Sequence, residues 1–324
     1  MGNRLLGIDI TPASDNDYDK AVALAKEAGA EVVSLSIFWD EIETSPGVFQ
    51  SKINWLKIAN SYYPAQELRV ALVISVIDTN QNRLPDDLKE KPFDHPDTIA
   101  RFKNFLEYVF SQIPDLELVS LSIGNEVDIY LGMDAGKWEQ YKNFYNAALK
   151  YAHQLHPNLL IGIKATLPGL TGDRRDHLET LNRNSDVILV TYYPLEGDFT
   201  VKEPVAVRED FQKLTALYPG RLIYFHETGY PSGARCDSSE QKQAEFVRQV
   251  FGAWDEHHDQ IGLVIFTWLT DVSPESVREM EKYYGLSDKT FLEYLGTLGL
   301  RHHLGTDKDA FSALKLEVQK RSAR

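Results

Sequence analysis

A chain of 324 residues with 43% hydrophobic residues is long enough to bury one large core, and one compact domain is the expected organisation. It has 48 acidic and 34 basic residues, a formal net charge of -14, and no cluster of Lys or Arg interleaved with aromatic residues, so nucleic acid is not expected as a partner. No run of about eighteen apolar residues predicts a membrane span.

The start of the chain and its cysteine content bear on the compartment. The first ten residues, MGNRLLGIDI, lead into a strand-like segment without the apolar core or cleavage site of a signal peptide. A cytoplasmic protein is therefore expected, although a secreted enzyme whose leader had been removed would have the same sequence. The single cysteine, Cys236, excludes an internal disulfide and any CxxC metal or redox motif. We expect an unpaired thiol in a loop, and neither a cofactor nor a bound metal.

Short apolar, β-branched runs alternate with longer amphipathic stretches along the whole chain, which is typical of repeated βα units. Eight runs predict strands at Leu5–Ile10, Val32–Phe38, Val70–Ile77, Leu118–Ile123, Leu159–Lys164, Val187–Thr191, Leu222–His226 and Gly262–Thr267. The stretches around them predict helices near residues 16–28, 51–61, 96–112, 137–155, 174–183, 207–217, 239–257 and 308–321. Eight such units close a barrel better than they fill an open sheet, so we predict an α/β fold, a single (β/α)8 barrel.

The main alternative fold, a Rossmann-type sheet that binds a nucleotide, lacks its motifs. No GxGxxG follows the first run, and no GxxxxGK[ST] occurs anywhere. Without a linker or low-complexity segment, one catalytic domain is expected over residues 1–324. Residues 272–306 form an insertion between the eighth strand and the last helix. Loops on that side of a barrel shape the active site, so we expect the insertion to form one wall of the pocket.

Polar residues that end the apolar runs are the candidate functional residues, because catalytic groups of a (β/α)8 barrel sit at the C-terminal ends of its strands. In chain order they are Asp9, Asp78, Asn125, Glu126, Lys164, Tyr192, Tyr193, His226, Glu227, Trp268 and Asp271. The aspartates, with Asp128, have two open interpretations, which are binding of substrate hydroxyls and capping of the following loop or helix.

Two glutamates at strand ends form the predicted catalytic pair. In LVSLSIGNEVD, two-residue alternation puts Ser120, Ser122, Gly124 and Glu126 on one face. In LIYFHETGYPSG, Glu227 shares a face with Ile223 and Phe225, and His226 alternates away from it. Both glutamates are therefore expected at the mouth of the barrel, on strands that are not neighbours. One protonated and one ionised carboxyl facing each other are what glycoside hydrolysis needs.

Four motifs resemble the glycoside hydrolases of clan A, which are retaining β-glycosidases with (β/α)8 barrels. They are IGNEVD at 123–128, TYYP at 191–194, HETGYPS at 226–232 and FTWLTD at 266–271. The run ETGYPS is similar to ETGWPS of β-1,3-glucanases, and YYP with ETxYP is similar to endo-β-1,4-galactanases. The segment SLSIFWDEIETSPGVF at 34–49 resembles the strand-two region of the clan.

The resemblance implies roles for single residues. Glu126 would be the acid/base and Glu227 the nucleophile, and Asn125 would bind the sugar 2-hydroxyl. Tyr192 or Tyr193 would hold or flank the nucleophile, but two-residue alternation lets only one of them face inward. Trp268 would stack under the sugar, with a non-prolyl cis peptide expected just after it. Further candidates for substrate binding are Trp39, Asp9 and His226.

The sequence departs from the clan pattern at two positions. Strand two ends in Phe38 and Trp39 and lacks the Arg of several clan families, and Lys164 has no role that the clan defines. The predicted function is retaining hydrolysis of β-linked oligo- or polysaccharides by double displacement, with a weak preference for endo action on a β-glucan or β-galactan. The alternatives are a metal-dependent sugar isomerase or epimerase, which requires His226 to point inward, and a carbohydrate-binding barrel without catalysis.

Overall fold

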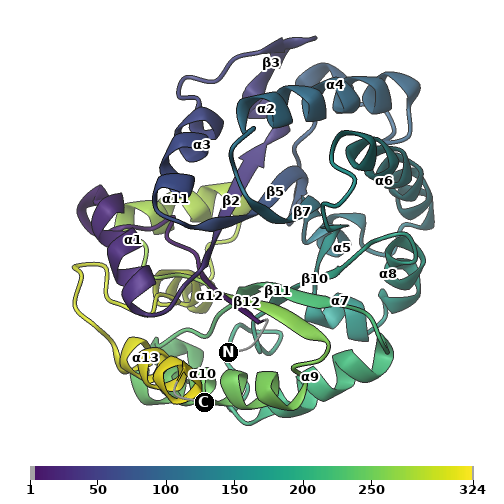
Figure 1. Ribbon diagram of the computed structural model, residues 1–324. Helices are drawn as coiled ribbons and strands as arrows, with labels where there is room; N and C mark the ends of the chain where they lie inside the picture. The colour runs from purple at the N-terminus through teal and green to yellow at the C-terminus, as the bar shows by residue number, and fades with distance from the viewer. Residues whose placement is uncertain (1–3, 323–324) are drawn as a thin grey trace. The chain divides into compact units, whose positions relative to one another are not determined.

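The computed structural model describes residues 4–322, and Figure 1 labels its elements. Its main sheet confirms the predicted (β/α)8 barrel. The hydrogen-bonded strand order in the described chain is β8-β7-β5-β2-β1-β12-β11-β10-β9. These strands are β1 (Leu5–Ile8), β2 (Val32–Phe38), β5 (Arg69–Asp78), β7 (Leu118–Asn125), β8 (Ile161–Gly162), β9 (Lys164–Thr166), β10 (Ile188–Tyr192), β11 (Ile223–Thr228) and β12 (Ile261–Phe266). A short strand, β6 (Gln81–Asn82), pairs antiparallel with β5.

Each of the eight predicted strands is present, and only the fifth is divided, into β8 and β9. Its division has a local cause, because the backbone N–H of Lys164 donates to the side-chain Oγ of Ser122 (3.0 Å). The same hydroxyl donates to the carbonyl oxygen of Gly124 (2.7 Å). A serine side chain therefore takes the place of a backbone partner at this point of the ladder.

The eight predicted helices are also present. They are α1 (Tyr18–Glu27), α3 (Trp55–Ala65), α4 (Pro96–Gln112), α6 (Ala135–Leu155), α8 (Arg175–Asn182), α9 (Ala206–Leu217), α10 (Glu240–Glu256) and α13 (Asp309–Ser322). Elements beyond the prediction are α2 (Trp39–Ile42), α5 (Val127–Leu131), α7 (Leu167–Thr171), α11 (Pro274–Tyr284), α12 (Lys289–Gly296) and the hairpin of β3 (Glu43–Ser45) with β4 (Val48–Phe49). Short 3-10 turns cover Ser14–Asn16, Asp86–Leu88 and Ala234–Cys236.

Side-chain caps define where several helices begin. The carboxylate of Asp17 accepts from the N–H of Lys20 at the start of α1, and the carboxylate of Asp134 accepts from two N–H groups at the start of α6. The same device starts α12, where Asp288 accepts from the N–H groups of Thr290 and Phe291. Such caps satisfy N–H groups that have no partner inside the helix.

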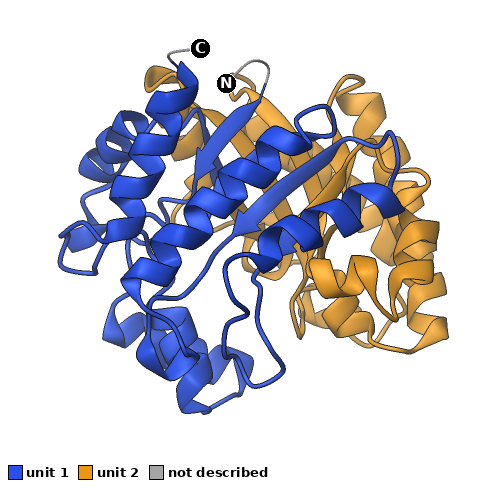
Figure 2. Ribbon diagram, turned by 90° about the horizontal axis from the view of Figure 1, so that it is seen from below, with its two compact units in different colours: residues 1–34, 191–324 blue, residues 35–190 orange. Residues whose placement is uncertain are grey.

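The chain divides into two compact units, which Figure 2 colours separately. Unit 1 consists of residues 1–34 and 191–324, and unit 2 of residues 35–190. In unit 1, β1 pairs in parallel with β12, and α10 packs against α13 beside it (Figure 1). In unit 2, β5 pairs in parallel with β7, and α4 packs against α6. Each unit therefore has its own parallel strands covered by helices.

Both units bury aromatic clusters between strands and helices. In unit 1 the ring centroids of Phe211 and Phe225 lie 4.3 Å apart in a stacked arrangement. In unit 2 the centroids of Phe102 and Phe144 lie 4.9 Å apart. The first contact joins α9 to β11, and the second joins α4 to α6. Among residues 4–322, no helix is both long enough and apolar enough to cross a membrane.

Candidate active site

Glu126 directly follows β7 in unit 2, at the C-terminal end of a parallel strand. Its backbone is in the left-handed region (φ 45°, ψ 45°), and its side chain is half-buried. Its Oε2 accepts a hydrogen bond from the Thr79 hydroxyl, 2.8 Å away. Thr79 follows β5, the neighbour of β7, and also has a positive φ of 50°. A carboxyl that is half-exposed and oriented by a hydroxyl donor is suited to exchange protons with a bound molecule.

A glycine two residues earlier lets the chain turn at this point. Gly124 has a φ of 89°, and a Cβ there would lie 2.5 Å from both the Tyr141 hydroxyl and a methyl group of Val127. The Tyr141 hydroxyl is fixed because it donates to the carbonyl oxygen of Ile123 (2.7 Å). Only glycine fits both the backbone angle and the space, so the turn that presents Glu126 depends on it.

Asn125 is held by the end of the neighbouring strand. Its Nδ2 donates to Oδ1 of Asp78 (2.8 Å), and its carbonyl oxygen accepts from the N–H of Thr79 (3.0 Å). Asp78 lies opposite Asn125, after a register shift between Ile74 and Asp78. The predicted candidates Asp78, Asn125 and Glu126 therefore come together. Thr79 was missed in the sequence, because a threonine after a strand has no distinguishing pattern.

Two other polar residues of unit 2, Asp128 and Lys164, are buried inside the fold. Asp128 is fully buried, and its carboxylate accepts from the N–H and the hydroxyl of Thr166 (2.9 and 2.7 Å). Burial raises the pKa of the Asp128 carboxyl, while these hydrogen bonds and the nearby Arg174 oppose the rise. Asp128 thus joins α5 to the start of α7. Lys164 is 1% exposed, and we have no functional account of it.

The prediction that Trp39 binds substrate is wrong. Trp39 begins α2, its side chain is fully buried, and its Nε1–H donates to Oε2 of Glu43 (2.6 Å). Its ring packs against Phe102 and Phe105 of α4, with centroids 5.1 and 5.8 Å away. The one-turn helix α2 rotates the side chain into the core, so no face is left for a sugar.

Glu227 lies near the end of β11 in unit 1 and is half-buried. Its Oε2 accepts a hydrogen bond from the Tyr193 hydroxyl, 2.6 Å away. Tyr193 directly follows β10, the neighbour of β11. Gly229 leaves room for this contact, because a Cβ at that position would lie 2.6 Å from the Tyr193 ring. Because the tyrosine holds one carboxylate oxygen in place, the direction in which the other oxygen points is also fixed.

The two tyrosines after β10 have different surroundings. Tyr192 is fully buried, its hydroxyl donates to Asp210 (2.8 Å), and its ring meets Phe211 edge-on, with centroids 5.5 Å apart. Burial and the Asp210 carboxylate raise the pKa of Tyr192 well above its usual value. Tyr193 alone faces Glu227, as alternation allows only one of the pair to do. Substrate binding by Tyr192 is therefore contradicted, because its side chain belongs to the core.

Trp268 and Asp9 lie side by side in the backbone network at the end of β12. Both are half-buried, and the N–H of Leu269 donates to the carbonyl oxygen of Asp9 (2.8 Å). The carboxylate of Asp9 accepts from the N–H of Thr11, which makes it a cap of its own loop. The non-prolyl cis peptide is Thr267–Trp268. It precedes Trp268, so the predicted position just after Trp268 was one bond too late.

His226 and Asp271 occupy buried positions. His226 is fully buried while its neighbour Glu227 is half-exposed. The predicted shared face of Phe225 and Glu227 is wrong, because the Phe225 ring stacks on a ring of α9, and the pairing of β11 shifts register just after Phe225. Asp271 accepts from the ammonium of Lys308 (2.7 Å) and from the N–H of Gly299 (2.8 Å). Burial raises the pKa of Asp271, and Lys308 opposes the rise. Asp271 is therefore part of a buried ion pair.

The insertion at 272–306 folds as α11 and α12, and an aromatic contact links it to the residues around Glu227. The Tyr294 ring of α12 meets the Tyr193 ring edge-on, with centroids 5.7 Å apart. Phe199 and Phe291 pack next to Tyr294 in the same cluster. The insertion thus supports the tyrosine that holds Glu227.

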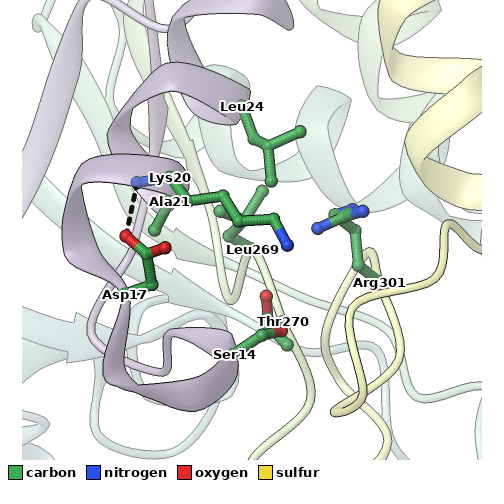
Figure 3. Close-up of a pocket in the computed structure, with 8 residues that line it drawn as sticks. All are labelled: Ser14, Asp17, Lys20, Ala21, Leu24, Leu269, Thr270 and Arg301. Atoms are coloured by element: carbon green, nitrogen blue, oxygen red, sulfur yellow. Dashed lines mark hydrogen bonds between the residues drawn. The ribbon is translucent and has the colours of Figure 1, made fainter.

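A small hollow in unit 1 is lined by residues that are not among the predicted site residues. Figure 3 shows its lining side chains, which come from the first 3-10 turn, α1, the segment after β12 and the loop before α13: Ser14, Asp17, Lys20, Ala21, Leu24, Leu269, Thr270 and Arg301. Asp17 is engaged there in capping α1. Within residues 4–322, no group of three or more His, Cys, Asp or Glu side chains is arranged to hold a metal ion. Cys236 is buried, and burial raises its pKa to about 12.

No protein-family model matches the chain, and no curated protein matches it. Solved structures of glycoside hydrolases share its fold. An exo-beta-1,4-mannosidase from Opitutaceae bacterium strain TAV5 has a TM-score of 0.77 and 14% identity, over 99% of this chain and 60% of the mannosidase. GH5_18 from Streptomyces cattleya in complex with GlcNAc has a TM-score of 0.74 and 16% identity, over 99% of this chain and 81% of the other. A Thermobacillus composti GH10 xylanase has a TM-score of 0.67 and 18% identity, over 97% of both chains. The chain spans only 60% of the mannosidase. At these identities the likeness shows the fold alone.

Proposed function

We propose that the chain is a retaining glycoside hydrolase of the clan A type, acting on β-linked oligo- or polysaccharides. The observation that supports this most is the 2.6 Å hydrogen bond from Tyr193 to Glu227 at the end of β11. It combines with a second strand-end glutamate, Glu126, that follows an asparagine on β7. The motifs around both glutamates resemble those of the clan, and the compared enzymes have the same fold.

The proposed mechanism is a double displacement. The Glu227 carboxylate attacks the anomeric carbon and forms a glycosyl ester, while Glu126 gives its proton to the departing glycosidic oxygen. Glu126, now a carboxylate, then removes a proton from water. As that proton leaves, the water oxygen bonds to the anomeric carbon and the ester bond to Glu227 breaks, which releases Glu227 as a carboxylate. The transferred proton leaves Glu126 protonated for the next cycle.

The neighbours of the two glutamates suit these roles. The Thr79 hydroxyl donates to Oε2 of Glu126 (2.8 Å), so the proton that Glu126 delivers would sit on Oε1. Asn125 is fixed through Asp78 (2.8 Å) in an orientation that could bind a sugar hydroxyl. In this proposal Trp268, which is half-buried, stacks under the sugar, since an apolar sugar face packs well on an aromatic ring.

We further propose endo action on a β-glucan or β-galactan, from the similarity of ETGYPS and YYP to the motifs of those enzymes. The compared structures include a mannosidase and a xylanase, so the test is a panel that contains their substrates as well. The panel consists of β-1,3-glucan, mixed-linkage glucan, β-1,4-galactan, β-mannan and xylan, with the chain length of the products measured. Oligomers indicate endo action. Release of monosaccharides alone would contradict it.

The stereochemistry of the first product tests the mechanism. Attack by a carboxylate needs a carboxyl–carboxyl separation of about 5 to 5.5 Å, whereas inversion needs roughly 6.5 to 9.5 Å to admit a water. We expect the short separation and therefore retention. Proton NMR during early hydrolysis should show the β-anomer first, followed by mutarotation. An initial α-anomer would exclude the double displacement.

Two further experiments separate this proposal from the alternatives. A metal-dependent isomerase would lose activity on treatment with a chelator and regain it with a divalent ion, whereas the proposed hydrolase keeps its activity. A carbohydrate-binding barrel would bind β-glycans but release no chromophore from aryl β-glycosides. Hydrolysis that is insensitive to chelator is the outcome that supports the proposal.

A further inference from the structure

A buried lysine joins the end of the insertion to the two loops that follow β11 and β12. Lys308 lies just before α13 and is 2% exposed. Its ammonium donates to Asp271 Oδ1 (2.7 Å) and Ser232 Oγ (3.0 Å), and to the carbonyl oxygens of Thr297 (3.2 Å) and Gly299 (2.9 Å). An ammonium is stable in such a place only when acceptors surround it, so these segments are held in one arrangement.

The segment held by Lys308, residues 297–300, is called the clasped segment. It contacts one candidate residue of unit 1 directly and lies close to a second. The N–H of Leu300 donates to the carbonyl oxygen of Trp268 (2.9 Å). At Gly229, a Cβ would lie 2.6 Å from the Tyr193 ring and 3.1 Å from a methyl group of the clasped segment, so both close on the same glycine. A shift of this segment would therefore move Trp268 directly. It would reach Tyr193 through Gly229 and through Tyr294, whose ring meets the Tyr193 ring three residues before the segment begins.

We propose that Lys308 is a positioning residue for the nucleophile: through the clasped segment it fixes Tyr193, and Tyr193 orients the Glu227 carboxylate. The inference rests on the proposed retaining mechanism. Lys308 touches neither the sugar nor Glu227. Its removal leaves Asp271 buried without its cation and takes away two of the hydrogen bonds that hold the clasped segment. The side-chain amide of Gln243, which donates to the carbonyl oxygens of Leu298 and Gly299 (both 3.1 Å), then holds the segment less firmly on its own. The expected consequence is a slower attack by Glu227 in molecules that are still folded.

The test uses 2,4-dinitrophenyl 2-deoxy-2-fluoro-β-glycosides of three disaccharides, cellobiose, β-1,4-galactobiose and β-1,4-mannobiose, so that an endo-acting enzyme can also bind them. Glu227 displaces the dinitrophenolate and forms a slowly hydrolysed glycosyl ester, which intact-protein mass spectrometry counts. Two quantities are measured for each variant, the labelling rate constant and the final label per protein molecule. A purely structural role lowers the labelled fraction through unfolding. A positioning role lowers the rate constant at full labelling.

Lys308→Met keeps the length of the side chain and removes the ammonium. We expect its labelling rate constant to fall about tenfold or more at full labelling, because small displacements of a reacting group have large kinetic effects. Thr297→Val is the milder variant, since it removes a single hydroxyl, which accepts from the N–H of Gly233 (3.1 Å) and donates to the carbonyl oxygen of Glu293 (2.8 Å). We expect a decrease of about threefold, and this variant keeps the test valid if Lys308→Met does not fold.

The matched control is Arg321→Met, which removes another cation of the same unit. Arg321 lies on α13 and pairs with Asp255 and Glu317, apart from the candidate residues. It should lower the melting temperature and leave the labelling rate constant unchanged. Equal rate constants for wild type, Lys308→Met and Thr297→Val would overturn the positioning role alone. A wild-type protein that none of the three probes labels would instead overturn the proposed function.

Discussion

Removal of one hydroxyl, in Tyr193→Phe, tests how the Glu227 carboxylate is oriented. The Tyr193 hydroxyl lies 2.6 Å from Oε2 of Glu227, a short distance for a donor to a charged acceptor. Hydrogen bonds to charged groups contribute about 1.5–3 kcal/mol. If that stabilisation is present in the transition state, its loss lowers the rate of glycosylation roughly 10- to 150-fold, since about 1.4 kcal/mol corresponds to a factor of ten.

The chain offers a matched control one residue away. Tyr192→Phe removes a hydroxyl that donates to Asp210 (2.8 Å) in the core, on the other side of β10. It should destabilise the fold by about 1–3 kcal/mol and leave the kinetics of the folded protein unchanged. Both variants are assayed for kcat/KM on an aryl β-glycoside, with the concentration of active enzyme determined by titration. Equal losses in both variants, or no loss in Tyr193→Phe, would refute the orientation argument.

Three further predictions concern the catalytic pair, the pH dependence of stability and the corrected role of Trp39. Glu227→Gly should lose hydrolysis and, with added azide, form the α-glycosyl azide from an activated substrate. Glu126→Ala should instead form the β-glycosyl azide. If NMR showed the same anomer from both variants, the roles of the two glutamates would have to be assigned anew. Burial raises the pKa values of Asp255 and Glu317, but hydrogen bonds outweigh it and leave both below their usual 3.8 and 4.5. These hydrogen bonds come from Arg321 and Arg4 at Asp255, and from Lys320 and Arg321 at Glu317. Because these two carboxyls have lower pKa values in the folded than in the unfolded protein, they stabilise the fold at any pH above the unfolded pKa values. That stabilisation is lost as the pH falls through the folded pKa values. Arg321→Met should therefore destabilise by about 1–2 kcal/mol at pH 7 and by much less at pH 3, as urea unfolding would measure. Because the indole lies in the core, Trp39→Phe should lower the free energy of unfolding by about 2–4 kcal/mol and leave KM within about twofold of the wild-type value. A large rise in KM with an unchanged free energy of unfolding would restore the substrate-binding role of Trp39.

The periodicity of the sequence was sufficient for the strands, and both glutamates lie at strand ends as predicted. The face of each glutamate is set by a local irregularity that periodicity does not predict. Gly124 has a positive φ before Glu126, and β11 shifts register between Phe225 and Thr228. Two-residue alternation also predicted that only one of Tyr192 and Tyr193 faces inward, but it did not identify which one. That choice depends on the pairing of β10 with its neighbours, and pairing partners are distant in the sequence.

Two errors have local physical causes. Trp39 ends an apolar run, so it looked like a residue of the mouth, but α2 begins there and turns the indole toward Glu43 four residues later. The helices of the insertion were not predicted, although the sequence contains residues that typically cap the start of a helix. Ser273 accepts from the N–H of Ser276 and is followed by a proline at the first helical position. These are the residues that commonly start a helix.

The end of β5 shows what no sequence pattern could have supplied. Thr79 has a φ of 50° and Glu126 a φ of 45°, in a region that β-branched residues in particular avoid. Each such backbone costs of order 1–3 kcal/mol and persists only where its surroundings hold it. Here the N–H of Thr79 donates to the carbonyl oxygen of Asn125, and its hydroxyl donates to Glu126. Two strained residues on neighbouring strand ends thus hold one carboxylate oxygen. A role in folding alone would not require this strain, because a glycine or asparagine would relieve it at Thr79 without losing the N–H donor. Only the hydroxyl would be lost, and the hydroxyl is the group that contacts the proposed acid/base.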